Sequence, residues 1–476
     1  MRTLLENLEF ALTVDRHDTV LKRASMVVEN DRIAALGPAA EIASRYPREA
    51  FDEIIDASRY GVVPGFIDGH VHLSETLSRA VFPDNLNTRA WVFHWAKPFY
   101  AHVNGEDEVV GARLGMAEML RNGTTCFLDM GAQNDVGGVA RAIDAIGMRG
   151  ITGRHAADVR PQQVPHGWTE EMMDHHFFPD AQTALSVLED TVKEWHGRAG
   201  GRVRCWVNIE GKEPCSLELH VGARALAQKL GVGTTYHLAT SVEEMRVSER
   251  KYGKTPVQRI GDAGGLGPNL VIAHAVAVTE YEIEQMAEHG TSVAFCPATS
   301  LKLGKGAASP GGRYPELIEA GVTVGLGTDG VSAGGNLNLM RQMYVVAGLF
   351  KDARVDATLI GARKALRMAT IENAQMLGWD DEIGSLEVGK KADFLLFDLD
   401  HSEWTPYGDP LQALVWSASP ASLAQTWVDG RALYRDDRVT TIDEKPLRAE
   451  ARERAARIVE RAGLGDATPV VSTTYD

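Results

Sequence analysis

The chain has 476 residues, of which 44% are hydrophobic and 24% are charged, and its formal net charge is −16. This length permits a large core, and the composition is globular rather than disordered. The acidic balance argues against nucleic acid or an anionic membrane as a partner, because both carry negative charge. No apolar run reaches the roughly 18 residues that a membrane-spanning helix needs. The four scattered cysteines and the lack of a secretory signal lead us to expect a cytoplasmic protein with reduced thiols.

The first sixty residues are predicted to form short strands, with a turn at Asn30-Asp31. Between residues 61 and 377 the pattern changes to helices that stop at glycine and are followed closely by β-rich runs. Such repeats indicate βα units around a parallel sheet, and their extent of about 300 residues suits a (β/α)8 barrel. The helix–glycine junctions lie at Gly123, Gly147, Gly231, Gly290 and Gly321.

Short strands return after Leu377, and a charged helical stretch follows them. We therefore predict an α/β fold with a (β/α)8 TIM barrel over residues 61–377. Residues 1–60 and 378–440 are expected to pair into one composite β-sandwich domain, because β-rich segments flank the barrel at both ends. Residues 441–476 are expected to form a C-terminal helix and tail.

Two histidines end the first predicted barrel strand, in the stretch VVPGFIDGHVH. His70 and His72 are two residues apart, so on a strand they face the same side. At the end of a barrel strand that side is the mouth of the active site. Neutral imidazoles suit a divalent ion such as Zn²⁺. The alternative is a pair of histidines that are merely hydrogen-bonded near a turn.

Three more residues end apolar strand-like runs: His237, His274 and Asp329. Each alone could be a buried polar residue with an ordinary hydrogen-bond partner. Because strand ends of a barrel converge on one face, their coincidence with the first histidine pair favours one metal site. A bound divalent ion lowers the pKa of water to about 7. A neighbouring carboxylate can accept the proton, and a histidine can position the water or stabilise an oxyanion.

The ordered segments VVPGFIDGHVH, HLA, VIAHAV, GTDG and IGSLEVGKKADFLLFD resemble the amidohydrolase superfamily. Within it they are similar to the cytosine/guanine deaminase and triazine hydrolase branch. The resemblance implies a (β/α)8 barrel, a composite β-sandwich, and one divalent metal per subunit. Zinc is the most common metal in such sites, and iron, cobalt or manganese are alternatives. The family habit also suggests a homodimer or larger homo-oligomer.

The resemblance assigns roles position by position. The metal ligands would be His70, His72, His237 and Asp329. Asp329 would also act as the general base and acid, and His274 would contact the attacking water or the substrate oxygen.

The chain departs from this branch three residues after His237, where a glutamate usually carries protons to a ring nitrogen. Thr240 occupies that position, and its hydroxyl cannot act as such an acid. Glu243 and Glu244 follow on the predicted helix; one of them could reach back, but a solvated helix start is the simpler interpretation. Deaminating an aromatic ring needs such an acid, whereas hydrolysing an amide, urea or carbamate does not.

A second departure is the segment that contains Glu210 and Lys212. Either residue could bridge a second metal, although surface charge is the simpler interpretation. His175 and His176 are adjacent and do not face the same side, so we predict no metal site there.

Substrate contacts are expected from an aromatic segment after the first barrel strand and from three small polar residues. Loops after barrel strands usually cover the substrate, and aromatic side chains there would favour an apolar or aryl ligand. Packing within a helix core is an equal alternative for these aromatics. The expected contacts are Trp91, Trp95, Thr240, Ser300 and Ser332.

The sequence therefore predicts a metal-dependent hydrolase of a non-peptide C–N bond, of the amide, urea or carbamate kind, in a small aryl or apolar molecule. The first alternative is an aminohydrolase or dechlorinase of a purine, pyrimidine or triazine ring, with Glu243 or a water chain replacing the missing glutamate. The second is an inactive amidohydrolase-like structural protein, against which the intact ligand set argues. We expect a small-molecule substrate and no nucleic acid or membrane partner.

Overall fold

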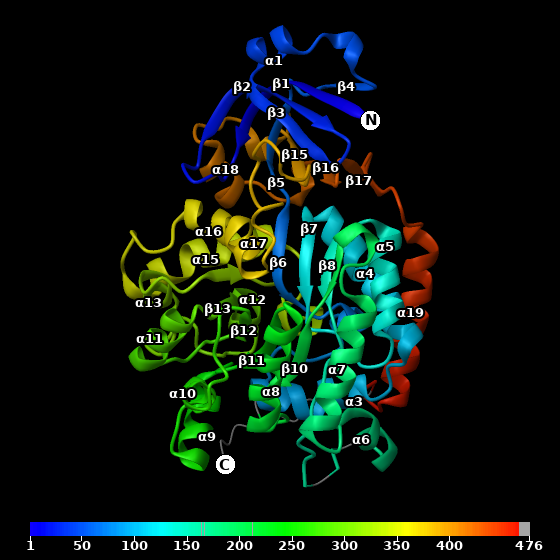
Figure 1. Ribbon diagram of the computed structural model, residues 1–476, viewed down its shortest axis with the longest axis vertical. Helices are drawn as coiled ribbons and strands as arrows, with labels where there is room; N and C mark the ends of the chain where they lie inside the picture. The colour runs from blue at the N-terminus through cyan, green and yellow to red at the C-terminus, as the bar shows by residue number, and fades with distance from the viewer. Residues whose placement is uncertain (163, 166, 212, 466–476) are drawn as a thin grey trace.

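Strand β6 carries the first histidine pair into a closed ring of parallel strands (Figure 1). The computed structural model describes all residues except 163, 166, 212 and 466–476. Two parallel sheets, ordered β6-β7-β8-β9 and β10-β11-β12-β13-β14, make up the ring. They meet where the Asp329 N–H donates to the His70 carbonyl at 2.9 Å, and where Ala156 forms a bridge with Ile209. β9 and β10 are separated only by Trp206 and occupy one strand position, with β9 paired to β8 and β10 paired to β11, so the nine strands fill eight positions. The predicted (β/α)8 barrel is confirmed.

The barrel strands are short and almost entirely buried, as expected for a parallel sheet covered by helices. They are β6 (Phe66–Val71), β7 (Thr124–Asp129), β8 (Arg149–Thr152), β9 (Val203–Cys205), β10 (Val207–Gly211), β11 (Thr234–Leu238), β12 (Leu270–His274), β13 (Ser292–Phe295) and β14 (Val324–Leu326).

Helices surround this ring, and three of them end at a glycine as the sequence predicts. Gly147, Gly231 and Gly290 follow α5, α8 and α11 with φ of 93°, 68° and 68°, a left-handed conformation that suits a residue without Cβ. The longer outer helices are α4 (Gly105–Arg121), α5 (Val136–Ile146), α7 (Ala181–Trp195), α8 (Leu217–Leu230), α9 (Val242–Tyr252), α10 (Pro256–Asp262), α11 (Glu280–His289), α15 (Leu339–Arg354), α16 (Ala362–Met368) and α17 (Ile371–Met376).

Short helical segments follow several barrel strands and shape the mouth. Behind β6 the chain forms α2 (Thr88–Trp91), the π-helical turn η3 (Val92–Ala96) and α3 (Lys97–Tyr100). The remaining ones are η2 (Leu73–Ser78), α6 (Glu170–His176), α12 (Pro297–Lys302), α13 (Tyr314–Glu319) and α14 (Val331–Gly334).

Both ends of the chain build one sheet above the barrel (Figure 1). Its order is β18-β17-β16-β15-β5-β1-β2-β3, with β4 paired to β1. The two halves join where β15 runs antiparallel to β5, with Leu395 opposite Val63. A separate apolar core, which includes Met26, Phe394 and Trp427, lies within this domain.

Strand β5 belongs to this sheet and leads directly into β6, so the chain passes from the composite sheet into the barrel at Gly65. The elements of this domain are β1 (Arg2–Leu12), β2 (Val20–Glu29), β3 (Arg32–Pro38), α1 (Ala39–Arg45), β4 (Glu53–Asp56), β5 (Tyr60–Pro64), β15 (Phe394–Asp398), α18 (Pro410–Trp416), β16 (Leu423–Val428), β17 (Arg431–Arg435) and β18 (Arg438–Val439).

The last described helix, α19 (Glu444–Arg461), packs along α4 of the barrel (Figure 1). Arg454 and Arg457 both donate to the buried Asp107 carboxylate, at 2.8 and 3.2 Å. In the described part of the chain, no helix combines the length and apolar character needed to cross a membrane.

A buried arginine connects the barrel to the composite domain. Arg149 begins β8 and is 1% exposed. Its guanidinium donates to Asp429 at 2.6 Å and to Asp393 at 3.3 Å, and both carboxylates belong to the composite domain.

We predict that Arg149→Met destabilises the protein by about 3–5 kcal/mol, because it leaves the Asp393 carboxylate buried without its cation. Urea unfolding followed by circular dichroism measures this change. The exposed Arg452, changed in the same way, is the control, and its effect should stay within about 0.5 kcal/mol. Equal effects of the two substitutions would contradict this account.

Candidate metal centre and active site

Four histidines and one carboxylate meet at the carboxyl ends of the barrel strands. His70 lies on β6, His237 on β11 and His274 at the end of β12, while His72 and Asp329 follow β6 and β14. The backbone is strained at two of them: φ is 80° at His274 and 62° at Asp329, a region that side-chain-bearing residues rarely adopt. Such outliers concentrate at functional sites, where the surrounding structure holds them.

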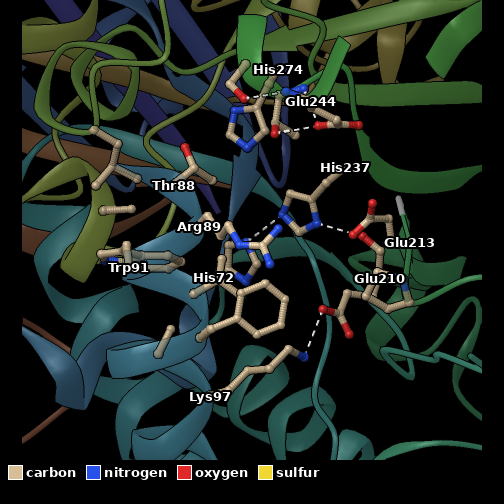
Figure 2. A pocket seen from close by; sticks show the side chains of 18 of the residues that line it. His72, Thr88, Arg89, Trp91, Lys97, Glu210, Glu213, His237, Glu244 and His274 are labelled. Atoms are coloured by element: carbon tan, nitrogen blue, oxygen red, sulfur yellow. Dashed lines mark hydrogen bonds and ion pairs between the residues drawn. The ribbon is translucent and has the colours of Figure 1, made fainter. Parts of the chain in front are cut away.

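Distances within this cluster are those of side chains directed at one point. His72 Nε2 lies 3.1 Å from His237 Nε2, as Figure 2 shows. The Asp329 carboxylate lies 3.6 Å from His70 Nε2, 3.5 Å from His72 Nε2 and 3.8 Å from His274 Nε2. The ligand atoms of His70, His72 and His237 lie within 4.8 Å of one another, and so do those of His70, His274 and Asp329.

The chemistry of this cluster fits a divalent cation. His70 is completely buried, yet neither of its ring nitrogens has a hydrogen-bond partner in the described chain. Leaving such a polar group unpaired is costly. Two imidazole nitrogens 3.1 Å apart also need a cation or a proton between them. Three histidine nitrogens and a carboxylate oxygen are a donor set that suits zinc. The ligand assignment itself stays a prediction.

The protein charges of the cluster favour an ionised carboxylate and a neutral His274. Burial alone would raise the pKa of Asp329, but the contact with His70 and the positive charge of the neighbouring Lys305 hold it well below its usual range. Burial, followed by the neighbouring Lys305 ammonium, holds the pKa of His274 well below its usual range. Lys305 Nζ lies 3.2 Å from His274 Nε2.

Hydrogen bonds from outside the cluster hold the ring of His237 and the backbone of His70 in place. His237 Nδ1 lies 2.8 Å from the carbonyl oxygen of Glu210, which leaves Nε2 facing the cluster. The carboxylate of Asp68 is fully buried. It accepts from the backbone N–H of His70 at 3.2 Å and from the backbone N–H of Thr328 at 3.1 Å. It therefore ties β6 to the chain just before Asp329.

A cavity of about 210 Å³ opens onto the cluster. Trp91 and Thr240 line it, as the sequence predicts, together with Phe93 and Trp168 on its aromatic side. Thus an apolar wall faces a polar metal cluster, an arrangement common in small-molecule sites.

Three expected substrate contacts do not line this cavity. Trp95 is 5% exposed and its ring packs against Phe82, as a helix-core residue does. The Ser300 hydroxyl accepts from the Ala307 N–H at 3.3 Å, and the Ser332 hydroxyl lies 3.3 Å from the Tyr100 hydroxyl.

The sequence interpretation of Glu244 as a solvated helix residue is wrong. Its carboxylate reaches back from α9 and accepts from the Ala239 N–H at 3.0 Å and the Thr240 N–H at 2.8 Å. The Thr240 hydroxyl donates to the same carboxylate at 2.6 Å. Glu244 also lines the cavity, so a carboxylate does occupy the neighbourhood of the missing glutamate. The signal was present: Ser241 and Glu244 have the S-x-x-E spacing of a capping box, whose glutamate folds back before the helix.

Glu210 is not a surface charge either. Its carboxylate accepts from Lys97 Nζ at 3.1 Å, as Figure 2 shows, and lies 3.0 Å from His176 Nε2. Glu210 belongs to none of the metal-binding clusters of the described residues. Lys212 lies outside the residues that the structure describes. His175 and His176 point to different partners, as their adjacency predicts.

Sequence reasoning missed several residues of the cavity. Lys305 follows α12 in a glycine-rich turn, and Glu75 lies 3.1 Å from His72 Nδ1. Burial alone would lower the pKa of His72, but the Glu75 and Asp329 carboxylates raise it to about 9 in the protein without a metal. No local pattern marks either residue, because Glu75 lies on the short helical segment η2 and Lys305 in a turn, and neither lies at the end of a barrel strand.

Comparison with known protein families supports the same assignment. The model of the amidohydrolase family matches residues 62–433, and that of an imidazolonepropionase-like composite domain of bacteria matches residues 26–48. The chain belongs to the amidohydrolase family. This amidohydrolase is 35% identical over 444 residues to a 5-methylthioadenosine/S-adenosylhomocysteine deaminase of Symbiobacterium thermophilum, covering 92% of this chain and 95% of that one.

Two further relatives carry related names. A 5'-deoxyadenosine deaminase of Methanosarcina mazei is 31% identical over 452 residues, covering 95% of this chain and 97% of that one. The crystal structure of an adenosine deaminase from Xanthomonas campestris with bound zinc superposes with a TM-score of 0.84 at 27% identity, covering 96% and 98% of the two chains. The predicted resemblance to the amidohydrolase superfamily is confirmed, and the chain is a metal-dependent hydrolase of C–N bonds other than peptide bonds.

We predict that removing the metal with a chelator lowers the thermal unfolding midpoint, because a ligand bound only to the folded state stabilises it by about 2.7 kcal/mol at a hundred times its Kd. Re-adding Zn²⁺ should restore the midpoint, as differential scanning calorimetry can measure. His72→Asn should lose most of the bound metal, while His289→Asn on the exposed end of α11 should keep it. Full metal content in His72→Asn would contradict the ligand assignment.

Proposed function

We propose that this amidohydrolase is a metal-dependent aminohydrolase that replaces the exocyclic amino group of a purine-type ring, in a small nucleoside-like substrate, with oxygen. The observation that carries the proposal is the Glu244 carboxylate, which binds Thr240 beside the metal cluster. The names of the relatives support the same reaction. The comparisons therefore favour the ring-deaminase alternative over the amide or urea hydrolase that the sequence led us to put first.

The reaction needs three proton movements. Water adds through its oxygen to the carbon that carries the amino group and gives up its two protons in turn, the ring nitrogen gains one of them, and the amino group gains the other and leaves as ammonia. A divalent metal, when bound by His70, His72, His237 and Asp329, lowers the pKa of water and so makes the nucleophile available near neutral pH.

The Asp329 carboxylate suits the first and last of these movements. Its low pKa keeps it ionised, so it can accept the proton of the attacking water and return it to the leaving amino group. His274 stays neutral and accepts from Lys305, which holds its ring in place beside Asp329.

Glu244 suits the second movement. Its carboxylate accepts from the N–H groups of Ala239 and Thr240 and from the Thr240 hydroxyl, which hold it at the carboxyl end of β11. Glu244 also lines the cavity that contains His237 and His274. We assign Glu244 to carry the proton to the ring nitrogen, in place of the glutamate that the branch has at position 240.

A second candidate is the hydrolysis of an amide, urea or carbamate bond. The hydrogen bonds of Glu244 also favour this candidate. They use the carboxylate as an acceptor for the turn at Ala239 and Thr240, and such a role is structural and needs no proton transfer. In that reaction the carbonyl needs no ring protonation, and Asp329 alone serves as base and then as acid. Zinc as the metal, a cytoplasmic location and a homo-oligomer are further parts of the proposal.

We predict ammonia release from aminopurine nucleosides such as 5'-deoxyadenosine and 5-methylthioadenosine by the zinc-loaded enzyme. A coupled ammonia assay on these compounds, run beside aryl ureas, carbamates and anilides, separates the two candidates. Turnover of the ureas or carbamates alone would reject the deaminase proposal and establish the second candidate.

We also predict that Glu244→Gln lowers kcat by about 100-fold or more, the usual contribution of a general acid or base. The amide oxygen of glutamine can still accept from the Thr240 N–H, so the turn should persist and circular dichroism should be unchanged. Glu243→Gln is the matched control, since Glu243 neighbours Glu244 and also lines the cavity, and kcat should change less than about threefold. A larger loss in Glu243→Gln than in Glu244→Gln would exchange their roles.

A further inference from the structure

Glu210 contacts the metal cluster through its backbone rather than through its carboxylate. Its carbonyl oxygen lies 2.8 Å from His237 Nδ1, and because a carbonyl can only accept, Nδ1 carries the proton and Nε2 is left to face the cluster. On its other side the Glu210 N–H donates to the Ala156 carbonyl at 2.8 Å. The orientation of the His237 ring therefore depends on where the Glu210 carbonyl is held.

The strand pairing is interrupted where this carbonyl turns toward His237. The register of β10 against β11 shifts between Asn208 and Gly211, and Gly211 lies opposite His237. Gly211 has φ of 86°, and a Cβ at this position would collide with the carbonyl oxygen of His237. Such an irregularity at a strand end redirects a backbone group, and its left-handed residue favours glycine. Regular pairing in the sheet therefore does not fix the Glu210 carbonyl.

The side chain of Glu210 supplies a second attachment for this residue. Its carboxylate accepts from Lys97 Nζ at 3.1 Å, as Figure 2 shows, and from His176 Nε2 at 3.0 Å. An ionised carboxylate only accepts, so His176 donates from Nε2 whatever the state of its other nitrogen. Both donors are 8% exposed. Hydrogen bonds of this charge-assisted kind are about twice as strong as those between neutral groups, so the side chain is held firmly.

The two donors come from segments that lie at the mouth of the barrel. Lys97 begins α3 behind β6, and His176 ends α6, which lies between β8 and β9 in the chain. The Lys97 ammonium also lies 5.7 Å from the ring centroid of Trp168 and 5.6 Å from that of Phe177. Aromatic rings attract a cation at such distances. The ammonium thus has a fixed place, and the Glu210 side chain is attached to it.

We propose that Lys97 and His176 are positioning residues for the metal ligand His237, and that they act through Glu210. They hold its side chain, the side chain fixes its backbone carbonyl, and the carbonyl orients the imidazole. Hydrogen-bond partners behind a metal-binding histidine set its orientation and the strength with which it binds the metal. The inference rests on the assignment of His237 as a ligand, and not on the reaction that we propose.

Zinc affinity separates this positioning role from the effect of charge alone. The affinity is measured without substrate, by competition with a chelator of known strength. By charge alone, removing the Lys97 cation would strengthen the binding of Zn²⁺ and removing the Glu210 anion would weaken it. The positioning role instead predicts that Lys97→Met and Glu210→Ala both weaken binding by about tenfold, the lower end of the effect typical of such partners. Tighter binding by Lys97→Met would overturn the proposal.

A double variant, Lys97→Met with Glu210→Gln, removes both charges together and leaves neither of them buried without its partner. It should bind Zn²⁺ about tenfold more weakly than the wild type, with an unchanged circular dichroism spectrum. The visible absorption bands of its Co²⁺-loaded form should shift, because they respond to the geometry of the ligands. Wild-type zinc affinity in the double variant, or an unchanged Co²⁺ spectrum, would overturn the proposal.

Three controls complete the experiment. Arg89→Met removes another cation that lines the cavity, and it should change the zinc affinity less than about twofold because Arg89 is exposed. Arg149→Met is expected to lose stability but does not line the cavity, so its folded form should bind Zn²⁺ as the wild type does.

The third control, His237→Asn, should lose the metal. Wild-type affinity in His237→Asn would remove the ligand assignment and this inference with it, whereas wild-type affinity in the Lys97 variants would overturn the inference alone. Neither result depends on which substrate the enzyme turns over.

Discussion

The repulsion among buried imidazole nitrogens is the constraint on which the site depends. His72 and His237 bring their Nε2 atoms to 3.1 Å, and the ring nitrogens of the buried His70 have no hydrogen-bond partner in the described chain. Histidines rarely accept such an arrangement unless a cation completes it. The left-handed backbone at His274 and Asp329 adds to this cost, and Asp68 ties β6 to the end of β14 and so holds the cluster together.

The chemistry differs between the two sides of the cavity. On the side of β11 and β12, Thr240 replaces an acid, and Glu244 brings a carboxylate back from the next helix. Glu244 lies in the first turn of α9, and its carboxylate is held by the backbone of Ala239 and Thr240. Its position therefore depends on the local fold as much as on the substrate. On the side of β6 and β10, the Glu210 carboxylate accepts from Lys97 and lies beside His176, so its charge is paired.

These two features give the family scaffold its individual character. The amidohydrolase model spans the barrel and the C-terminal half of the composite domain, from residue 62 to residue 433. The Lys97–Glu210 pair joins α3 to β10, and the Thr240–Glu244 pair joins the residue after β11 to the first turn of α9. Both pairs lie beside the strand ends that carry the predicted metal ligands, so they shape the cavity around the cluster.

The sequence by itself determined those features whose residues recur at a short, regular spacing along the chain. His70 and His72 share a strand face because side chains alternate along a strand, and the recurrence of helix, glycine and strand implied the barrel whose strand ends converge. It also indicated both termini as one domain, which the pairing of β5 with β15 bears out. Only the tertiary structure decided that Glu244 bonds to Thr240, that Trp95 faces a helix core, and that Glu210 is held by Lys97 and His176. The reason is physical: the contacts of Trp95 and Glu210 join side chains from different elements around one cavity, which no local spacing encodes. The S-x-x-E spacing of Ser241 and Glu244 is compatible with a glutamate that folds back, but it does not specify Thr240 as its partner.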